Sequence, residues 1–131
     1  MPAPAHWRLE EWRDLEEWLR AVDLFNYGYW WECHEALEGL WLAAGRTTPQ
    51  ARFVQSLVHL SAACLNDRRG HVEASRRQAA RAVRGLRASR ALGSRVMGVH
   101  PAELAESVVR AFSSSESTPA RLRILLAGVE P

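Results

Sequence analysis

One stretch of this chain, FNYGYWWECHEALEGLW from Phe25 to Trp41, restricts the possible folds more than any other feature. It is among the most apolar segments of the sequence, yet it contains His34, Glu35 and Glu38. Moving a carboxylate away from water is costly unless it gains hydrogen bonds, an opposite charge or a metal ion. We therefore expect these side chains to find partners elsewhere in the fold and to mark a site.

The composition predicts one compact domain over residues 1–131. A chain of this length, 47% hydrophobic and 24% charged, can bury a core without crosslinks. Its two cysteines, Cys33 and Cys64, are too few for a disulfide framework or a thiolate zinc site, and they favour a reducing cytoplasm. We expect no signal peptide, because the N-terminus has an early Trp and acidic residues in place of a basic region and an apolar run. We expect no membrane span, because no apolar run reaches the roughly 18 to 20 residues that a span needs.

Apolar residues recur at three- and four-residue spacings along the chain, and no run alternates as a strand would. The sequence therefore predicts an all-α fold, a compact bundle of five to six helices. We expect helices over about 7–23, 29–44, 49–67, 72–87 and 101–112, followed by a solvated loop at 113–117. A short last helix is expected to begin at Thr118-Pro119 and to carry Leu122, Ile124, Leu125 and Leu126.

The helix from Tyr29 to Ala44 is expected to be the central one, because apolar side chains extend most of the way round it. Thr48 and Pro49 are typical of an N-cap and a first helical position, so the next helix begins directly afterwards. The short connection predicts that these two helices form an antiparallel hairpin.

At 1.5 Å per residue, His34 lies about 15 Å before the end of its helix, and His59 lies about 14 Å after the start of the next. The two histidines should therefore be level in the hairpin, as should Glu38 and Gln55. Rotation of the helices about their axes decides whether these side chains converge. The candidate polar site comprises Glu32, His34, Glu35, Glu38, Gln55 and His59.

Three interpretations of this cluster stay open. It could be a buried hydrogen-bond network, with the glutamates paired to arginines. It could be a divalent metal site with His34, Glu38 and His59 as ligands, since residues four apart on a helix can bind one ion together. It could also be a metal-free acid/base site using His34 and Glu35, although no serine or cysteine is spaced as a nucleophile. The arginines available to a buried network are Arg52, Arg68 and Arg69.

The chain contains 17 arginines and no lysine. Arg77, Arg81 and Arg84 share one stripe of the fourth expected helix, which would form a basic surface. RNA or an acidic protein could bind there. Solvated helix surface is the more usual explanation, because no aromatic residue interleaves the arginines and the net charge is only +2.

The pattern FNxGxWWExHExLExxW, followed by Phe53-x-Gln55-x-Leu57, Ala62-Ala63 and Arg69-Gly70, resembles the uncharacterised prokaryotic domain-of-unknown-function family 309. The resemblance covers about residues 7–90, and residues 91–131 would add C-terminal helices. It implies a small all-helical fold in which one helix is surrounded by the others, with no established activity. Family members commonly have glycine at the position of Ser56 and asparagine at that of His71.

We hypothesise that the His/Glu cluster binds a small polar ligand or a divalent metal ion, and the sequence does not decide whether the protein is an enzyme. The alternative is a non-catalytic interaction module, in which the cluster is purely structural and the arginine surface binds RNA or an acidic protein. No membrane partner is expected. A homo-oligomer and a nucleic-acid partner stay open, and the expected location is the cytoplasm.

Overall fold

The computed structural model describes residues 3–113 and 119–127. Within these residues the secondary structure consists of helices joined by loops, with one isolated bridge between Val96 and Val99. The α-helices are α1 (Glu16–Asn26), α2 (Trp30–Ala43), α3 (Pro49–Arg68), α4 (Val72–Ala88) and α5 (Pro101–Ser113). The described residues also form three short 3-10 helices, η1 (Leu9–Asp14), η2 (Ser89–Leu92) and η3 (Pro119–Arg121). The predicted all-α class is confirmed.

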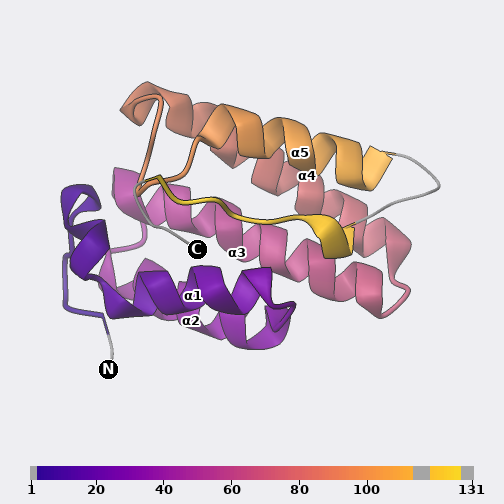
Figure 1. Ribbon diagram of the computed structural model, residues 1–131, viewed down its shortest axis with the longest axis horizontal. Coiled ribbons are helices and arrows are strands. Elements are labelled where there is room, and N and C mark those ends of the chain that lie inside the picture. The colour runs from indigo at the N-terminus through magenta and orange to yellow at the C-terminus, as the bar shows by residue number, and fades with distance from the viewer. Residues whose placement is uncertain (1–2, 114–118, 128–131) are drawn as a thin grey trace.

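Each α-helix packs against the next one in the chain, so the fold is a series of helical hairpins. Figure 1 shows α1 and α2 on one side of α3, and α4 and α5 on the other. All of these elements share one hydrophobic core. The predicted hairpin of the second and third helices is present as α2 and α3.

The middle position belongs to α3, one helix later than predicted. Helix α3 buries residues along its whole length and packs against both α2 and α4. On α2 the apolar residues Trp31 and Leu42 are 52% and 49% exposed. The apolar surface that suggested a fully enclosed α2 therefore lies partly at the molecular surface.

The connection between α2 and α3 follows the predicted turn chemistry. Gly45 adopts a left-handed φ of 93° just past the end of α2, a conformation that costs glycine little. Thr48 caps α3 by accepting a hydrogen bond from the Ala51 amide at 3.2 Å, and Pro49 occupies the first helical position. These residues hold the hairpin close to the sequence-based expectation.

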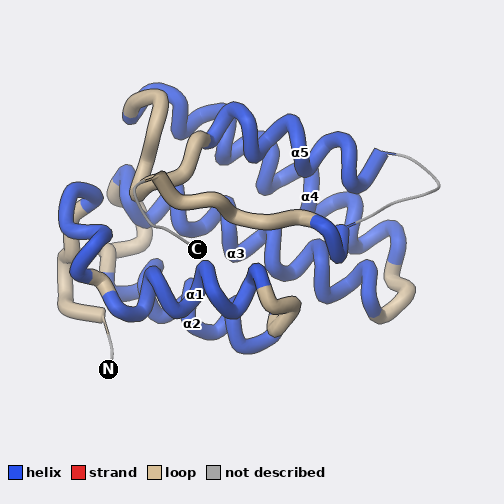
Figure 2. Tube along the Cα trace, in the orientation of Figure 1, coloured by secondary structure: helices blue, strands red, loops and turns tan. Residues whose placement is uncertain are grey.

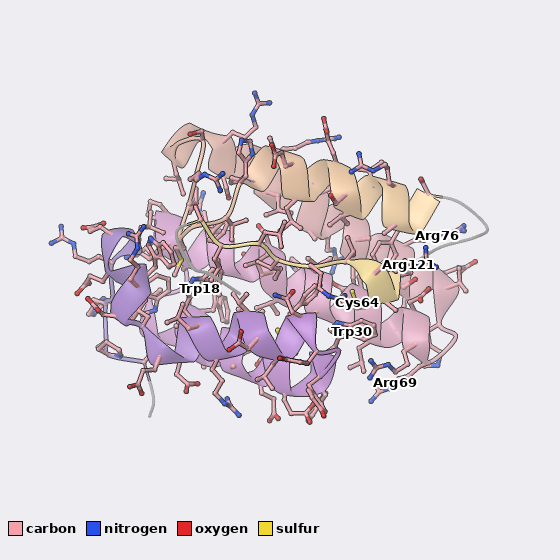
Figure 3. All side chains as sticks on the ribbon, viewed as in Figure 1. Trp18, Trp30, Cys64, Arg69, Arg76 and Arg121 are labelled. Atoms are coloured by element: carbon pink, nitrogen blue, oxygen red, sulfur yellow. The ribbon has the colours of Figure 1, made fainter. Side chains whose placement is uncertain are left out.

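Two tryptophans pack at opposite ends of the α1–α2 layer and contact the two ends of α3. The Trp18 ring packs against Phe53, with ring centroids 6.0 Å apart, and Trp30 lies at the other end of the α1–α2 layer (Figure 3). The Arg68 guanidinium sits 4.1 Å from the centre of the Trp30 ring and donates to the Gly28 carbonyl at 2.7 Å. A cation over an aromatic face is attracted by the ring electrons. This contact ties α3 to the start of α2.

The prediction of one continuous helix over about 7–23 is wrong, because this region forms two separate elements, η1 and α1. Leu15 leaves the helical region, with φ −88° and ψ 95°. Trp12 and Trp18 are both buried, although six residues along a continuous helix would place them about 120° apart. The break lets both rings face the core. Upstream, Trp7 is buried and its Nε1 donates to the Leu40 carbonyl at 2.9 Å.

The predicted last helix is also wrong. Only Pro119–Arg121 forms a helical turn, and residues 122–126 that follow are not helical. Leu122 and Ile124 are buried while Arg123 and Leu125 are exposed, which is the two-residue alternation of an extended chain. Most of the predicted 113–117 loop lies outside the described residues, and Ser113 itself ends α5.

This C-terminal segment crosses between α1 and α5 (Figure 2). The Asn26 side chain holds this segment by hydrogen bonds to both the backbone amide and the backbone carbonyl of Ile124. Asn26 Nδ2 donates to the Ile124 carbonyl at 3.0 Å, and the Ile124 amide donates to Asn26 Oδ1 at 2.7 Å. Farther along, the Ala127 amide donates to the Gly98 carbonyl at 2.8 Å. In the described residues no helix combines the length and apolarity needed to cross a bilayer.

We predict that Asn26→Ala destabilises the protein by about 1–3 kcal/mol, because both backbone groups of Ile124 lose their partner in a part-buried place. Urea unfolding measures the loss, and hydrogen exchange of the Ile124 amide locates it. Asn66→Ala is the matched control, since the Asn66 side chain bonds only within α3, to the Ala62 carbonyl. Equal losses in the two variants would contradict this role of Asn26.

Candidate functional site

The predicted polar cluster is divided between two places in the structure. Helix α2 turns its buried stripe, which includes Cys33, Leu37 and Leu40, toward its neighbours. That rotation sends Glu32, Glu35 and Glu38 to the surface, with His34 half-buried among them. Gln55 and His59 instead line a cleft on the other side of α3, where α4 packs. The six residues are therefore two separate groups.

His34 makes its contacts within α2. Its Nδ1 lies 3.2 Å from Glu38 Oε1, and its ring stacks on Trp31 with centroids 6.3 Å apart and planes inclined by only 7°. The expected partnership of His34 and Glu38 is therefore present. Glu38 is 52% exposed at its side chain, so the pair is a surface interaction of modest strength.

The predicted metal set of His34, Glu38 and His59 is not gathered. Across residues 3–113 and 119–127, no three His, Cys, Asp or Glu side chains form a group that could hold a metal ion. The physical reason is the rotation of α2, which points the first two side chains outward while His59 faces α4.

The buried network of glutamates and arginines is not formed either. Arg68 interacts with Trp30 and Gly28, and no ion pair joins Arg52 or Arg69 to a glutamate in the described part of the chain. Figure 3 shows Arg69 extending away from the body of the molecule. The glutamates need no such partners, because water solvates them.

A cleft of about 660 Å³ lies between α3 and α4. We call it the α3–α4 cleft. It is lined by side chains from the start and middle of α3, from α4, and from η2 at the end of α4. These residues are Thr47, Pro49, Arg52, Gln55, Ser56, His59, Arg81, Arg84, Gly85, Ala88, Ser89, Ala91 and Leu92.

Small residues bring the two helices together at the floor of the α3–α4 cleft. Ser56 is 2% exposed, and its hydroxyl donates to the Arg52 carbonyl at 3.2 Å. A Cβ placed on Gly85 would overlap Ser56 Oγ and lie 3.0 Å from Ser56 Cβ. Only glycine fits at this contact while Ser56 stays in place. Because the two backbones lie close together at this contact, the longer side chains on either side of it form the walls of the cleft.

His59 is held in one orientation on the wall of the cleft. Its Nδ1 lies 2.8 Å from Gln78 Oε1 on α4. An amide oxygen only accepts hydrogen bonds, so this contact places the proton of neutral His59 on Nδ1 and leaves Nε2 as an acceptor. The histidine can thus receive a hydrogen bond from a bound molecule.

Three arginines surround the same cleft. Arg52 comes from α3, and Arg81 and Arg84 come from α4; all three are exposed. None forms an ion pair with a carboxylate in the part of the chain that the structure describes. No acidic residue lines the cleft. Guanidinium groups without carboxylate partners favour phosphate and carboxylate ligands, which they bind through paired N–H groups.

A family comparison agrees with the core of this architecture. The model of a family described as Domain of unknown function (DUF309) matches residues 18–78. Over these residues the chain is similar to that family. The match spans α1 to the start of α4, and it is shorter at both ends than the expected 7–90. No curated protein matches the chain.

Much of the DUF309 sequence motif serves the fold. Gly28 and Trp30 hold Arg68, and Asn26 holds the C-terminal segment. The sequence predicts Gln55 and His59 on α3 as part of one candidate site. It predicts the arginine stripe of α4 as a separate surface and does not place the two at one cleft. The sequence analysis did not predict that Gln78 belongs to the site. The only sequence signal for it is that Gln78 is a polar residue on α4 and lies level with His59 in the α3–α4 hairpin. Of the predicted basic surface, Arg77 lies outside the cleft.

The two cysteines, Cys33 and Cys64, offer no nucleophile. Both are fully buried free thiols. Burial raises the pKa of Cys33 to about 12. Burial, with the nearby Asp67 charge second, raises the pKa of Cys64 well above its usual range. Thiolates are the reactive form of cysteine, so both side chains are chemically quiet at neutral pH.

We predict that neither thiol reacts with an aromatic disulfide reagent at pH 8 while the protein is folded, and that both react once it is unfolded in urea. Because unfolded thiols ionise near pH 9 and Cys33 in the fold does so only near 12, stability should fall as the pH rises between these values. Absorbance of the released aromatic thiolate follows the reaction. Rapid labelling of the native protein would contradict the burial argument.

We predict that Gly85→Ala destabilises the protein by about 1–3 kcal/mol, because the new methyl group overlaps Ser56. In a Ser56→Gly background the same change should instead stabilise by up to about 1 kcal/mol, since alanine is the better helix former. Urea unfolding of the four proteins gives the coupling. A loss of similar size in both backgrounds would show that Ser56 does not set the spacing.

Proposed function

We propose that the α3–α4 cleft binds a small anionic ligand carrying a phosphate or carboxylate group. The observation that carries this proposal is the meeting of Arg52, Arg81 and Arg84 around one cleft without a carboxylate partner in the described residues. Three like charges close together repel one another, and an anion between them relieves that repulsion.

The size and lining of the cleft support a small molecule as the ligand. Its volume of about 660 Å³ falls inside the range of about 300–1,000 Å³ typical of small-molecule sites. Pro49, Ala88 and Leu92 supply apolar wall, while Gln55 and His59 supply hydrogen-bonding groups. A few polar groups set in an apolar wall fix the orientation of a ligand.

The start of α3 adds a weaker attraction of the same sign. Pro49 and Arg52 belong to the first turn of this 20-residue helix, and both line the cleft. The aligned peptide dipoles give a helix N-terminus a partial positive charge. His59 then adds an acceptor, so a ligand that has both an anionic group and a hydroxyl group would satisfy the whole site.

The geometry favours this ligand over a divalent metal ion, the other ligand in our hypothesis. A bound cation would lie among guanidinium groups, which repel it, and the cleft contains no carboxylate. We infer a binding function and assign no reaction, because the cleft contains His59 but no activated nucleophile. A cytoplasmic location fits the two free cysteine thiols.

The alternative remains an interaction module, in which Arg77, Arg81 and Arg84 bind RNA or an acidic protein along α4. All three arginines are exposed, and they share one helical stripe. Arg77 separates the two proposals, because it belongs to the stripe but does not line the cleft. A long polyanion would use Arg77 as much as its neighbours, whereas a small ligand would not.

We predict that calorimetric titration at low salt detects binding of pyrophosphate or citrate, and that Arg81→Ala weakens it about tenfold or more. Loss of one charge-assisted hydrogen bond costs about 1.5–3 kcal/mol. His59→Ala should weaken the binding of a phosphate ester that carries hydroxyl groups. Arg77→Ala and His34→Ala are the matched controls, since both residues lie outside the cleft.

Two results would overturn the small-ligand proposal. One is absence of binding by any of these anions at low salt. The other is equal weakening by Arg77→Ala and Arg81→Ala, combined with tighter binding of a short single-stranded RNA. That second result would favour the interaction module, whose affinity should also fall steeply with salt.

A further inference from the structure

A second depression lies on the other side of α4, between α4 and α5. We call it the α4–α5 groove; its volume is about 490 Å³. It shares Arg84 with the α3–α4 cleft and is otherwise lined by different residues. Nothing in the proposed ligand site requires this groove, so it needs its own explanation.

The floor of the α4–α5 groove is apolar and partly open to water. Val83 and Phe112 form its base, and Val109 on α5 is 41% exposed. An exposed valine in line with other apolar side chains is a surface that gains free energy when another apolar group covers it.

Arginines line the α4 edge of the groove. Arg76, Arg84 and Arg87 belong to its lining, and all three are exposed. None is paired with a carboxylate in the described ranges 3–113 and 119–127. From Arg76 to Arg87 the helix advances about 16 Å, or three turns. Figure 3 shows Arg76 close to one end of the molecule, where α4 begins.

We propose that the α4–α5 groove binds an acidic amphipathic helix of a partner protein. The hollow between two packed helices accepts a third helix, whose apolar stripe covers the floor formed by Val83, Val109 and Phe112. Glutamates or aspartates beside that stripe meet the arginines of the α4 edge. About three turns of partner helix span the arginine row.

Charge and shape together favour this occupant over nucleic acid. The groove offers an apolar floor to a ligand that has apolar side chains, and a phosphodiester backbone has none. Its only aromatic ring, Phe112, is 7% exposed and gives bases little face to stack on. A helix with acidic and apolar faces uses both the arginines and the floor.

The groove can be tested separately from the ligand site. Arg76 and Arg87 line only the groove, whereas Arg52 and Arg81 line only the cleft. Charge reversal at one pair therefore leaves the other site intact. All four side chains are exposed, so these changes should leave the fold in place.

The probe is a synthetic four-turn helix with leucines on one face and glutamates on both sides of them, labelled for fluorescence anisotropy at low salt. We expect the full chain to bind it, and the double variant Arg76→Glu and Arg87→Glu to weaken binding at least tenfold. Val109→Asp should also weaken it at least tenfold. The control variant Arg52→Glu and Arg81→Glu should change the affinity less than twofold, and a copy of the peptide with lysines should not bind.

Three outcomes would overturn the proposal: no binding of the acidic helix, equal loss in the groove and cleft variants, or equal binding of the lysine peptide. Sedimentation of the protein alone supplies a further check. A dimer that dissociates when Arg76 and Arg87 are reversed would assign the groove to a second copy of this chain instead. Pyrophosphate and citrate titrations of the same variants report the cleft separately, so failure of one site leaves the other measurable.

Discussion

The contact between Ser56 and Gly85 is the constraint on which the rest of the candidate site depends. Helices α3 and α4 are in tight contact at Ser56 and Gly85, where neither helix has a bulky side chain. One turn from this contact, Arg52 and His59 on α3 and Arg81 on α4 are long and polar. Close backbones with long flanking side chains leave a hollow above the contact. The cleft is therefore a product of small residues as much as of charged ones.

Helix positions could be predicted from this sequence, and helix rotation could not. The spacing of apolar residues placed the α2–α3 hairpin correctly, and the four-residue spacing of His34 and Glu38 within one helix predicted their contact. Which face of α2 packs inward depends on the sum of many apolar contacts, and nearly continuous apolar residues round the helix left several rotations open. The structure turns Leu37 inward and Trp31 outward, so His34 and His59 serve different surfaces.

The two ends of the chain were harder to predict because tertiary contacts override local pattern there. Leu122 to Leu126 is too short for a stable helix of its own. Its backbone instead bonds to Asn26, 98 residues earlier in the chain. Likewise, η1 separates from α1 so that Trp12 can reach the core. No window of sequence around either segment contains its partner, whereas Gly45 and Thr48 act on their own neighbours.

The small net charge of +2 conceals an uneven distribution of charge, with glutamates on α2 and arginines on α4. The charged side chains of α4 are arginines apart from Glu73, while α2 carries glutamates and no arginine. Helix α3 lies between them, and at physiological salt a charge is screened beyond about 8 Å. The glutamates of α2 therefore do little to cancel the field at α4. An anion approaching the cleft or the groove meets the local arginines, so the small net charge is no argument against binding there.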